Sequence, residues 1–195
     1  MKTAGKPMMD LPAIERGSTM DVTVRRETEK DHEAVFELVR LAFENAEYGD
    51  HDEQFLVERL RRSQAFVPEL SLVAESRGRI VGHIMLTELV IETENGRVRS
   101  LTLAPVSVLP ECQKRGIGSK LIIEGLSEAK RLGYGSVLLV GHAHYYPRFG
   151  FRRASGWGIR APFDVPDEAF MAIELEEDAL ANAAGTMILP AEFFA

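Results

Sequence analysis

One stretch of the sequence, residues 101–140, constrains the fold more than any other because four signals follow one another in it. An apolar run ends at Pro110, a loop with two glycines follows, and then come a segment of helical periodicity and the uninterrupted apolar run Ser136–Val140. Such a short run without alternation indicates a strand buried on both faces. The helical segment, at about Gly118–Leu132, is followed by Gly133, the residue type that commonly ends a helix. The stretch predicts a strand–helix–strand crossover, which joins two parallel strands of one sheet.

The segments on either side of this crossover predict antiparallel strands and two helices. Asn95-Gly96 is a strong hairpin signal between long strands at Arg79–Glu92 and Arg97–Leu109. Thr28, with Asp31 three residues later, predicts the cap of a helix that ends near Phe43. The other expected elements are strands at Val22–Arg26, Leu70–Glu75 and Phe170–Leu175, a helix near Glu53–Arg62, and an irregular tail. The predicted fold class is α+β: a mostly antiparallel mixed sheet with one parallel pair in its middle, flanked by helices.

Composition excludes several classes of protein. The 195 residues suit one domain at 21–195 behind a flexible N-terminal extension at 1–20. The formal net charge of −7 argues against a nucleic-acid partner, and the apolar runs are too short to span a membrane. A single cysteine, Cys112, excludes an intrachain disulfide and favours a reducing compartment, so we expect a cytoplasmic protein. The acidity is local, because residues 161–195 hold eight acids and no Lys or Arg, while residues 1–160 carry 23 − 22 = +1.

The glycine-containing loop of the crossover has the features of an anion site. Gln113-Lys114-Arg115-Gly116-Ile117-Gly118 precedes a helix, whose first backbone N–H groups have no partner inside the helix and attract phosphates. Glycine lets a pyrophosphate approach the backbone closely, and Lys114, Arg115 and Lys120 add positive charge. A Walker motif is excluded because Ser119, not Lys, follows Gly118, and the dinucleotide fingerprint lacks its third glycine. A plain turn with solvated basic residues is the alternative.

Two motifs about 30 residues apart resemble those of the GNAT-type N-acetyltransferases. The run Val106-Ser107-Val108-Leu109-Pro110-Glu111, followed by Gln113–Gly118, is similar to the family's central strand and its Gln-x-x-Gly-x-Gly loop. The segment Tyr145-Tyr146-Pro147-Arg148-Phe149-Gly150-Phe151 is similar to the family's Tyr-x-Arg-x-Gly-Phe segment. The resemblance extends over Val22–Leu175 in element order and is specific within residues 101–151.

The resemblance implies a GNAT-like acyl-CoA N-acyltransferase fold, in which the central parallel strands splay apart and hold acetyl-CoA as co-substrate. Backbone groups of Val106, Ser107 and Val108 would pair with the pantetheine arm, and the Val108 N–H would polarise the thioester carbonyl. Tyr146 would protonate the leaving thiolate as general acid, while Tyr145 would pack. The residues expected to hold the pyrophosphate are Gln113, Lys114, Arg115, Gly116, Ile117, Gly118 and Ser119.

The sequence does not identify the base that deprotonates the amine. The candidates are His83, Glu88, Ser107 and Glu111, and a water relay is an equal alternative. His83 and Glu88 are five positions apart on one predicted strand, so they should face opposite sides of the sheet. His142 and His144 stand where relatives often have Asp-Pro-x, and metal binding or help in deprotonating the amine are two interpretations of them. Plain polar residues at a strand end are favoured, because two histidines lack a third ligand, and no metal is expected.

The implied activity is direct acetyl transfer to a primary amine of a small molecule or peptide. Acids between Phe43 and Glu53 and in the C-terminal stretch would favour a cationic acceptor if they lie at the acceptor entrance; solvated acids that only confer solubility are the alternative. No nucleic-acid or membrane partner is expected, and assembly as a homodimer stays open. A non-catalytic acyl-CoA-binding sensor is the alternative function, and a P-loop-like nucleotide binder is disfavoured.

Overall fold

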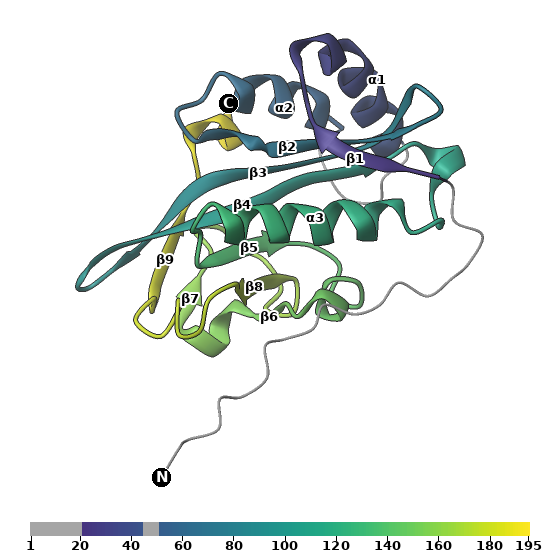
Figure 1. Ribbon diagram of the computed structural model, residues 1–195. Coiled ribbons are helices and arrows are strands. Elements are labelled where there is room, and N and C mark those ends of the chain that lie inside the picture. The colour runs from purple at the N-terminus through teal and green to yellow at the C-terminus, as the bar shows by residue number, and fades with distance from the viewer. Residues whose placement is uncertain (1–20, 45–50) are drawn as a thin grey trace.

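The computed structural model describes residues 21–44 and 51–195, so the expected extension at 1–20 lies outside the described residues. One mixed sheet forms the centre of the molecule, and helices cover both of its faces (Figure 1). Its strands are β1 (Thr23–Arg26), β2 (Phe66–Ser76), β3 (Arg79–Thr93), β4 (Gly96–Val108), β5 (Ser136–Val140), β6 (Arg152–Arg153), β7 (Ile159–Arg160), β8 (Phe170–Glu174) and β9 (Gly185–Ile188). The helices are α1 (His32–Phe43), α2 (Glu53–Arg61) and α3 (Ile117–Arg131), with short 3-10 turns that include Tyr146–Phe149.

The sheet is mostly antiparallel, as predicted. Its main path runs in the order β1-β2-β3-β4-β5-β8-β6, and the hairpins β2–β3 and β3–β4 make its long central part. Arg77 and Gly78 form the first hairpin turn, both with positive φ (51° and 77°), the geometry that matches the twist of two antiparallel strands. In the second turn Thr93 pairs with Gly96, so the loop residues are Glu94 and Asn95.

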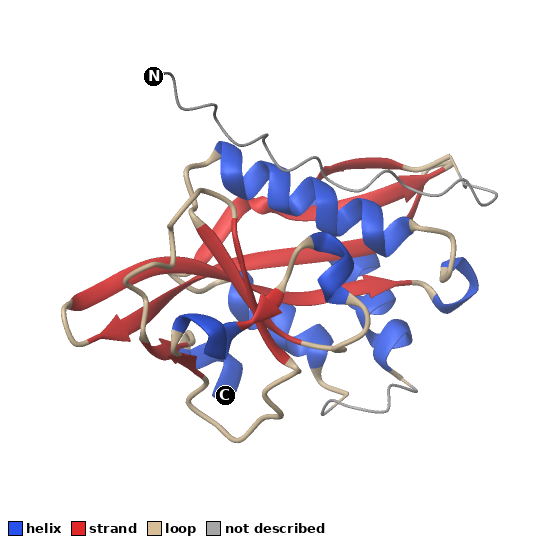
Figure 2. Cartoon of the chain, turned by 90° about the horizontal axis from the view of Figure 1, so that it is seen from below, coloured by secondary structure: helices blue, strands red, loops and turns tan. Residues whose placement is uncertain are grey.

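Helices α1 and α2 pack together on one face of the sheet, and α3 lies along the other (Figures 1 and 2). The α3 face is tightly packed: a Cβ added to Gly82 of β3 would lie 2.9 Å from a Leu121 methyl carbon. A Cβ on Gly125 of α3 would likewise lie 3.1 Å from a Leu86 methyl carbon. Residues 82, 84 and 86 of β3 therefore face α3, and by the alternation of a strand residues 83, 85 and 87 face α1 and α2. Among the described residues, no helix is long and apolar enough to cross a membrane.

The parallel pair in the middle of the sheet separates after two residue pairs. β4 pairs with β5 only at Leu101↔Val137 and Thr102↔Leu138, although β4 continues to Val108. A bulge sits at the point of separation, because Ala104 and Pro105 of β4 together oppose a single residue of β3. β5 instead keeps β8 as its antiparallel partner over its whole length. The expected splayed pair is thus confirmed, and a gap opens beside the last residues of β4.

The irregular tail expected after residue 175 is wrong in one respect. Residues 185–188 form β9, which pairs antiparallel with residues 90–93 of β3, beyond the point where β2 ends its pairing with that strand. Gly185 allows the approach, since a Cβ there would lie 2.1 Å from the carbonyl oxygen of Glu92. The four residues 185–188 begin with a glycine and have no alternation of apolar and polar residues that would predict a strand. They form one because this part of β3 has a free edge on the side that β2 does not reach.

Candidate active site

The gap between β4 and β5 is the mouth of a cleft of about 1470 Å³. Four parts of the chain that are distant in sequence line it: residues of α1 and α2, the end of β4 with the loop before α3, the segment that follows β5, and residues 165–169 before β8. Predicted site residues that line it are Val106, Val108, Gln113, Lys114, Gly116, Ile117, Gly118, Ser119 and Tyr146. The two sequence motifs therefore meet at one cleft.

The loop at residues 113–119 has the geometry of an anion cradle. Gly116 adopts φ 80° as the N-cap of α3, and Lys114 is also in the left-handed region with φ 59°. The Gln113 side-chain amide donates to the Val108 carbonyl oxygen at 3.2 Å, which fixes the loop to the end of β4. Arg115 is exposed and does not line the cleft. Lys120 turns away from the loop and donates to the carbonyl oxygen of Val22, so it is not part of the predicted basic cluster.

Register and alternation determine where the backbone of β4 points. The Leu109 N–H donates to the Val81 carbonyl oxygen at 3.0 Å, and the same register places Ser107 opposite His83. In an antiparallel pair every second residue bonds to its partner strand, so Ser107 bonds toward β3 while the N–H groups of Val106 and Val108 point to the gap. The Ser107 side chain is buried on the α1 and α2 side, and its hydroxyl has no hydrogen-bond partner among the residues that the structure describes. Val106 and Val108 are placed to contact a ligand, whereas Ser107 is not.

Tyr146 follows β5 and lies in a closely fitted site. A Cβ on Gly141 would be 2.3 Å from Cε2 of Tyr146, so only glycine leaves room for this ring. Edge contacts with Tyr145 and Phe151, at centroid distances of 5.2 and 5.8 Å, hold the ring further. Burial, with a smaller effect of Tyr145, raises the pKa of Tyr146 to about 12. The hydroxyl is therefore protonated at neutral pH and can donate a proton.

None of the four base candidates lines the cleft with its side chain. Glu88 is on the α3 side, where it accepts hydrogen bonds from Arg99 and from the Tyr134 hydroxyl (2.5 Å). His83 is fully buried on the opposite side, so the expected opposite orientation is confirmed. Glu111 is exposed and pairs with Arg79 at 2.9 Å.

His83 belongs to a buried polar cluster beneath α1 and α2. Its Nε2 is 3.1 Å from the Ser71 hydroxyl, which donates to Glu27 at 2.5 Å, and Glu27 forms an ion pair with Arg61. Burial lowers the pKa of His83, and this effect exceeds the raising effect of Glu27. His83 is therefore a neutral core residue.

The histidine pair and the cysteine have separate places. His142 lines the cleft, while His144 does not. Within the described parts of the chain, no group of three or more His, Cys, Asp or Glu side chains is placed to hold a metal ion. Cys112 is a buried free thiol beside the loop and also lines the cleft.

Residues outside the two motifs also line the cleft. They are Phe43, Glu53 and Leu56 from α1 and α2, and Val165 and Glu168 from the segment before β8. Of the acids expected between Phe43 and Glu53, Glu53 lines the cleft, whereas Asp52 is exposed and does not. Glu44 pairs instead with Arg40, and Glu47 and Asp50 lie outside the described residues. The acidic C-terminal stretch contributes Glu168, one of the acids that the charge pattern proposed for the acceptor entrance.

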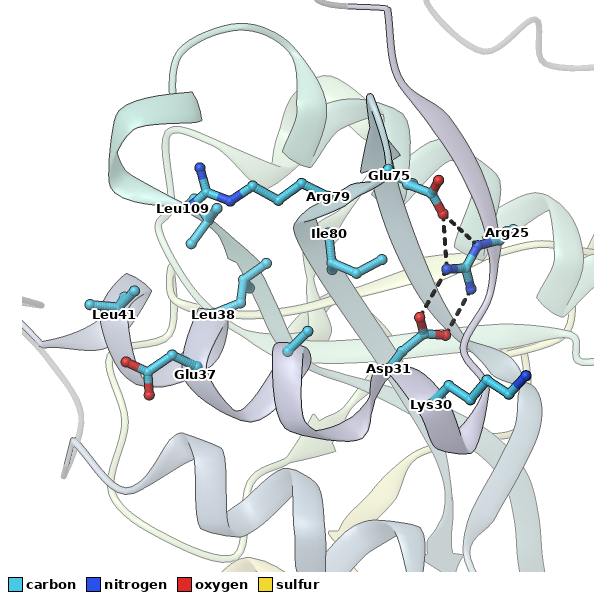
Figure 3. A pocket seen from close by; sticks show the side chains of 12 residues that line it. Arg25, Lys30, Asp31, Glu37, Leu38, Leu41, Glu75, Arg79, Ile80 and Leu109 are labelled. Carbon is cyan, nitrogen blue, oxygen red and sulfur yellow. Dashed lines mark hydrogen bonds and ion pairs between the residues drawn. The ribbon is translucent and has the colours of Figure 1, made fainter.

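A smaller recess of about 450 Å³ lies between α1 and the β2–β3 hairpin (Figure 3). Its wall includes Arg25, which is held by Asp31 at 2.8 Å and Glu75 at 2.9 Å. These hydrogen bonds raise the pKa of the Arg25 guanidinium and lower that of the Asp31 carboxyl, against the effect of burial on each. None of the predicted site residues lines this recess, and its most tightly held charged groups, Arg25, Asp31 and Glu75, pair with one another.

Comparison with known proteins agrees with the geometry of the larger cleft. A family model described as an acetyltransferase (GNAT) domain matches residues 23–154. The uncharacterized N-acetyltransferase YjhQ of Escherichia coli is 37% identical over 126 residues, which cover 64% of this chain and 70% of that protein. A GNAT family acetyltransferase of Brucella melitensis, solved in complex with acetyl-CoA, is 30% identical with a TM-score of 0.73, covering 88% of this chain and 97% of that one.

A second solved structure extends the agreement in fold. The GNAT family N-acetyltransferase YhbS of Escherichia coli, solved in complex with CoA, has a TM-score of 0.79 at 23% identity and covers 93% of this chain and 97% of that one. At this identity the likeness concerns the fold. Together with the matched family model and the cleft at the splayed strands, it leads to one assignment: the chain belongs to the GNAT family of N-acetyltransferases, enzymes with the acyl-CoA N-acyltransferase fold.

Proposed function

We propose that this enzyme transfers the acetyl group of acetyl-CoA directly to a primary amine of a small molecule or peptide. One observation carries the proposal: the loop at residues 113–119, the unpaired end of β4 and Tyr146 all line the same cleft. A phosphate cradle, a backbone donor and a proton donor in one cleft are what thioester aminolysis requires.

The loop fits the phosphates of acetyl-CoA. The N-terminus of α3, a helix of 15 residues, presents backbone N–H groups there, and Lys114 lines the cleft beside them. Gly118 keeps the backbone accessible, since a Cβ at this position would lie 3.3 Å from the Tyr145 hydroxyl. Gln113, Lys114, Gly116, Ile117, Gly118 and Ser119 would hold the pyrophosphate, with Arg115 contributing charge from outside the cleft.

The chemistry follows from two groups. The backbone N–H of Val108 donates a hydrogen bond to the thioester carbonyl oxygen, which gains negative charge as the neutral amine attacks. A C–N bond forms, the C–S bond breaks, and Tyr146 donates its proton to the departing thiolate. With its pKa raised to about 12, Tyr146 carries its proton at neutral pH before the step. The proton lost by the amine passes to solvent, and solvent returns one to Tyr146, since none of His83, Glu88, Ser107 and Glu111 lines the cleft.

Acidic side chains in the cleft lining support a cationic acceptor. Besides the basic Lys114 and Arg148, the lining includes Glu53 of α2 and Glu168 of the segment before β8. Phe43 and Leu56 beside Glu53 add apolar surface for a hydrocarbon stem. A cationic amine should therefore have a higher kcat/KM than a neutral amine of the same length, and Glu53→Gln should reduce this preference about 3- to 10-fold. Equal kcat/KM for the matched amines at low salt would contradict the preference.

The first experiment is a broad amine screen that follows release of free CoA. In the same assay Tyr146→Phe should lower kcat by roughly 10²-fold or more while calorimetry gives an unchanged Kd for acetyl-CoA. Binding of acetyl-CoA without turnover of any amine would favour the sensor alternative, and absence of binding would refute both. The single, buried, free Cys112 supports a cytoplasmic site of action, which fractionation of the native cells would test.

A further inference from the structure

Arg148 lies on the opposite wall of the cleft from the anion loop. It belongs to the turn Tyr146–Phe149 after β5 and lines the same cleft as Lys114 and Ser119. Its Nε donates to the Tyr145 carbonyl oxygen at 2.9 Å, and its guanidinium carbon lies 4.6 Å from the centroid of the Tyr145 ring. The guanidinium is thus stacked on an aromatic face and fixed through one of its five donors.

Tyr145 connects this arginine to the first turn of α3. Its hydroxyl is 3.4 Å from the Ser119 hydroxyl and 3.3 Å from where a Cβ of Gly118 would be. Edge contacts with Tyr146 and Phe149, at 5.2 and 5.4 Å between centroids, fix the ring from the other side. One end of the Tyr145 ring therefore reaches the loop while its face carries Arg148, which brings the guanidinium to the cradle from across the cleft.

The charge of Arg148 is not neutralised within the described parts of the chain, where no carboxylate forms an ion pair with it. Its neighbours differ: Arg152 pairs with Glu174 at 3.7 Å and Arg153 with Asp167 at 3.2 Å. A stacked guanidinium with its terminal N–H donors uncommitted is suited to a phosphate, which it can bind through two parallel hydrogen bonds.

We propose that Arg148 binds a phosphate group of acetyl-CoA, so that the phosphates are held from both walls of the cleft. The proposal rests on the proposed function, since it takes acetyl-CoA as the ligand of the loop. Stacking on Tyr145 orients the guanidinium before the ligand arrives, which reduces the conformational entropy lost on binding. The group bound is a phosphate in either case, whether it is the pyrophosphate or the 3′-phosphate of the nucleotide.

The test is calorimetry with CoA, dephospho-CoA and pantetheine on the full chain. Arg148→Ala should weaken CoA binding about 10- to 100-fold, and Arg148→Lys should give a smaller loss because a lysine lacks the planar fork. The matched control is Arg152→Ala, which removes another arginine that stacks on an aromatic ring, Trp157 at 4.5 Å, but pairs with a carboxylate outside the cleft. This control should change the Kd of CoA less than 2-fold.

The ligand series identifies the phosphate and separates the two levels of the argument. A loss that persists with dephospho-CoA assigns Arg148 to the pyrophosphate, and a loss that disappears assigns it to the 3′-phosphate. An unchanged Kd for CoA in Arg148→Ala would overturn the proposal. An equal loss of affinity for pantetheine, which has no phosphate group, would overturn it as well. If Arg148→Ala does not fold, Arg148→Gln, which keeps a polar donor for the Tyr145 carbonyl, gives the same decision. Failure of the wild-type chain to bind CoA would instead refute the proposed function.

Discussion

Replacement of Gly141 by alanine should impair catalysis without touching a reacting atom. The new Cβ would lie 2.3 Å from Cε2 of Tyr146, and 3.0 and 3.2 Å from two further ring carbons. Carbon atoms pack at about 3.5–4.0 Å, so the ring must move by about 1 Å or more. A displacement of about 1 Å at a reacting group costs roughly 10²-fold in rate, and overpacking a core costs about 1–3 kcal/mol of stability. We expect kcat to fall roughly 10²-fold while the Kd of acetyl-CoA is maintained.

The assay is steady-state release of CoA with the best amine of the screen, together with thermal unfolding. Gly156→Ala is the matched control, because a Cβ at Gly156 meets no atom within 4 Å, and it should leave both kcat and Tm unchanged. The decisive comparison uses the Tyr146→Phe background. If the alanine acts through the Tyr146 hydroxyl, it should cost far less kcat there than in the wild-type chain. An equal loss in both backgrounds, or wild-type kcat in Gly141→Ala, would refute the reasoning.

Two further predictions concern stability. Burial raises the pKa of Glu27, but interactions with His83 and other neighbours outweigh it and lower the pKa from 4.5 to about 2. This carboxylate therefore stabilises the fold above pH 4.5, and that contribution is lost as pH falls toward 2. The free energy of unfolding of Glu27→Gln, measured with urea, should depend less on pH over this range; the same dependence as in the wild-type chain would contradict this. The lowered pKa of His83 acts in the same direction below its ordinary 6.5. Ser107→Ala should raise the free energy of unfolding by about 1 kcal/mol, because it removes a buried hydroxyl without a partner. Ser100→Ala, which breaks two buried hydrogen bonds, should lower it by roughly 1–3 kcal/mol, and the same sign for both variants would contradict the argument.

The fold was predictable wherever the hydrophobic pattern of a segment agrees with the strand pairing that the segment makes. Ser136–Val140 has the same bounds in the sequence prediction and in the structure, because a run buried on both faces carries its own boundaries. The opposite orientation of His83 and Glu88 followed from strand alternation alone. β9 was not predictable from local pattern, because it forms against the open edge of β3, which lies far earlier in the chain.

The site was predictable only as far as the motifs extend. Gly116 and Gly118 signalled a close approach to the backbone, and the structure places both at the cleft. Lys120 was grouped with the loop because of its charge, but the turn of α3 rotates it toward β1, where it meets the Val22 carbonyl. The charge pattern proposed two acidic segments for the acceptor entrance, but it did not indicate which acids line the cleft; tertiary packing brings Glu53 of α2 and Glu168 of the segment before β8 there. Arg148 belongs to the motif at residues 145–151, but the sequence does not show that its guanidinium stacks on the Tyr145 ring.

The pairing of β9 with β3 has a consequence for synthesis of the protein. A ribosome makes the chain from its N-terminus, so the edge at Val90–Thr93 emerges long before its partner at Gly185–Ile188. During that interval the nascent sheet has an unpaired strand edge, which is a template for pairing with another chain. Residues 185–188 therefore cover an edge that could otherwise pair with another chain. A chain cut short before residue 185 would contain the loop at residues 113–119 and still have this edge of β3 unpaired.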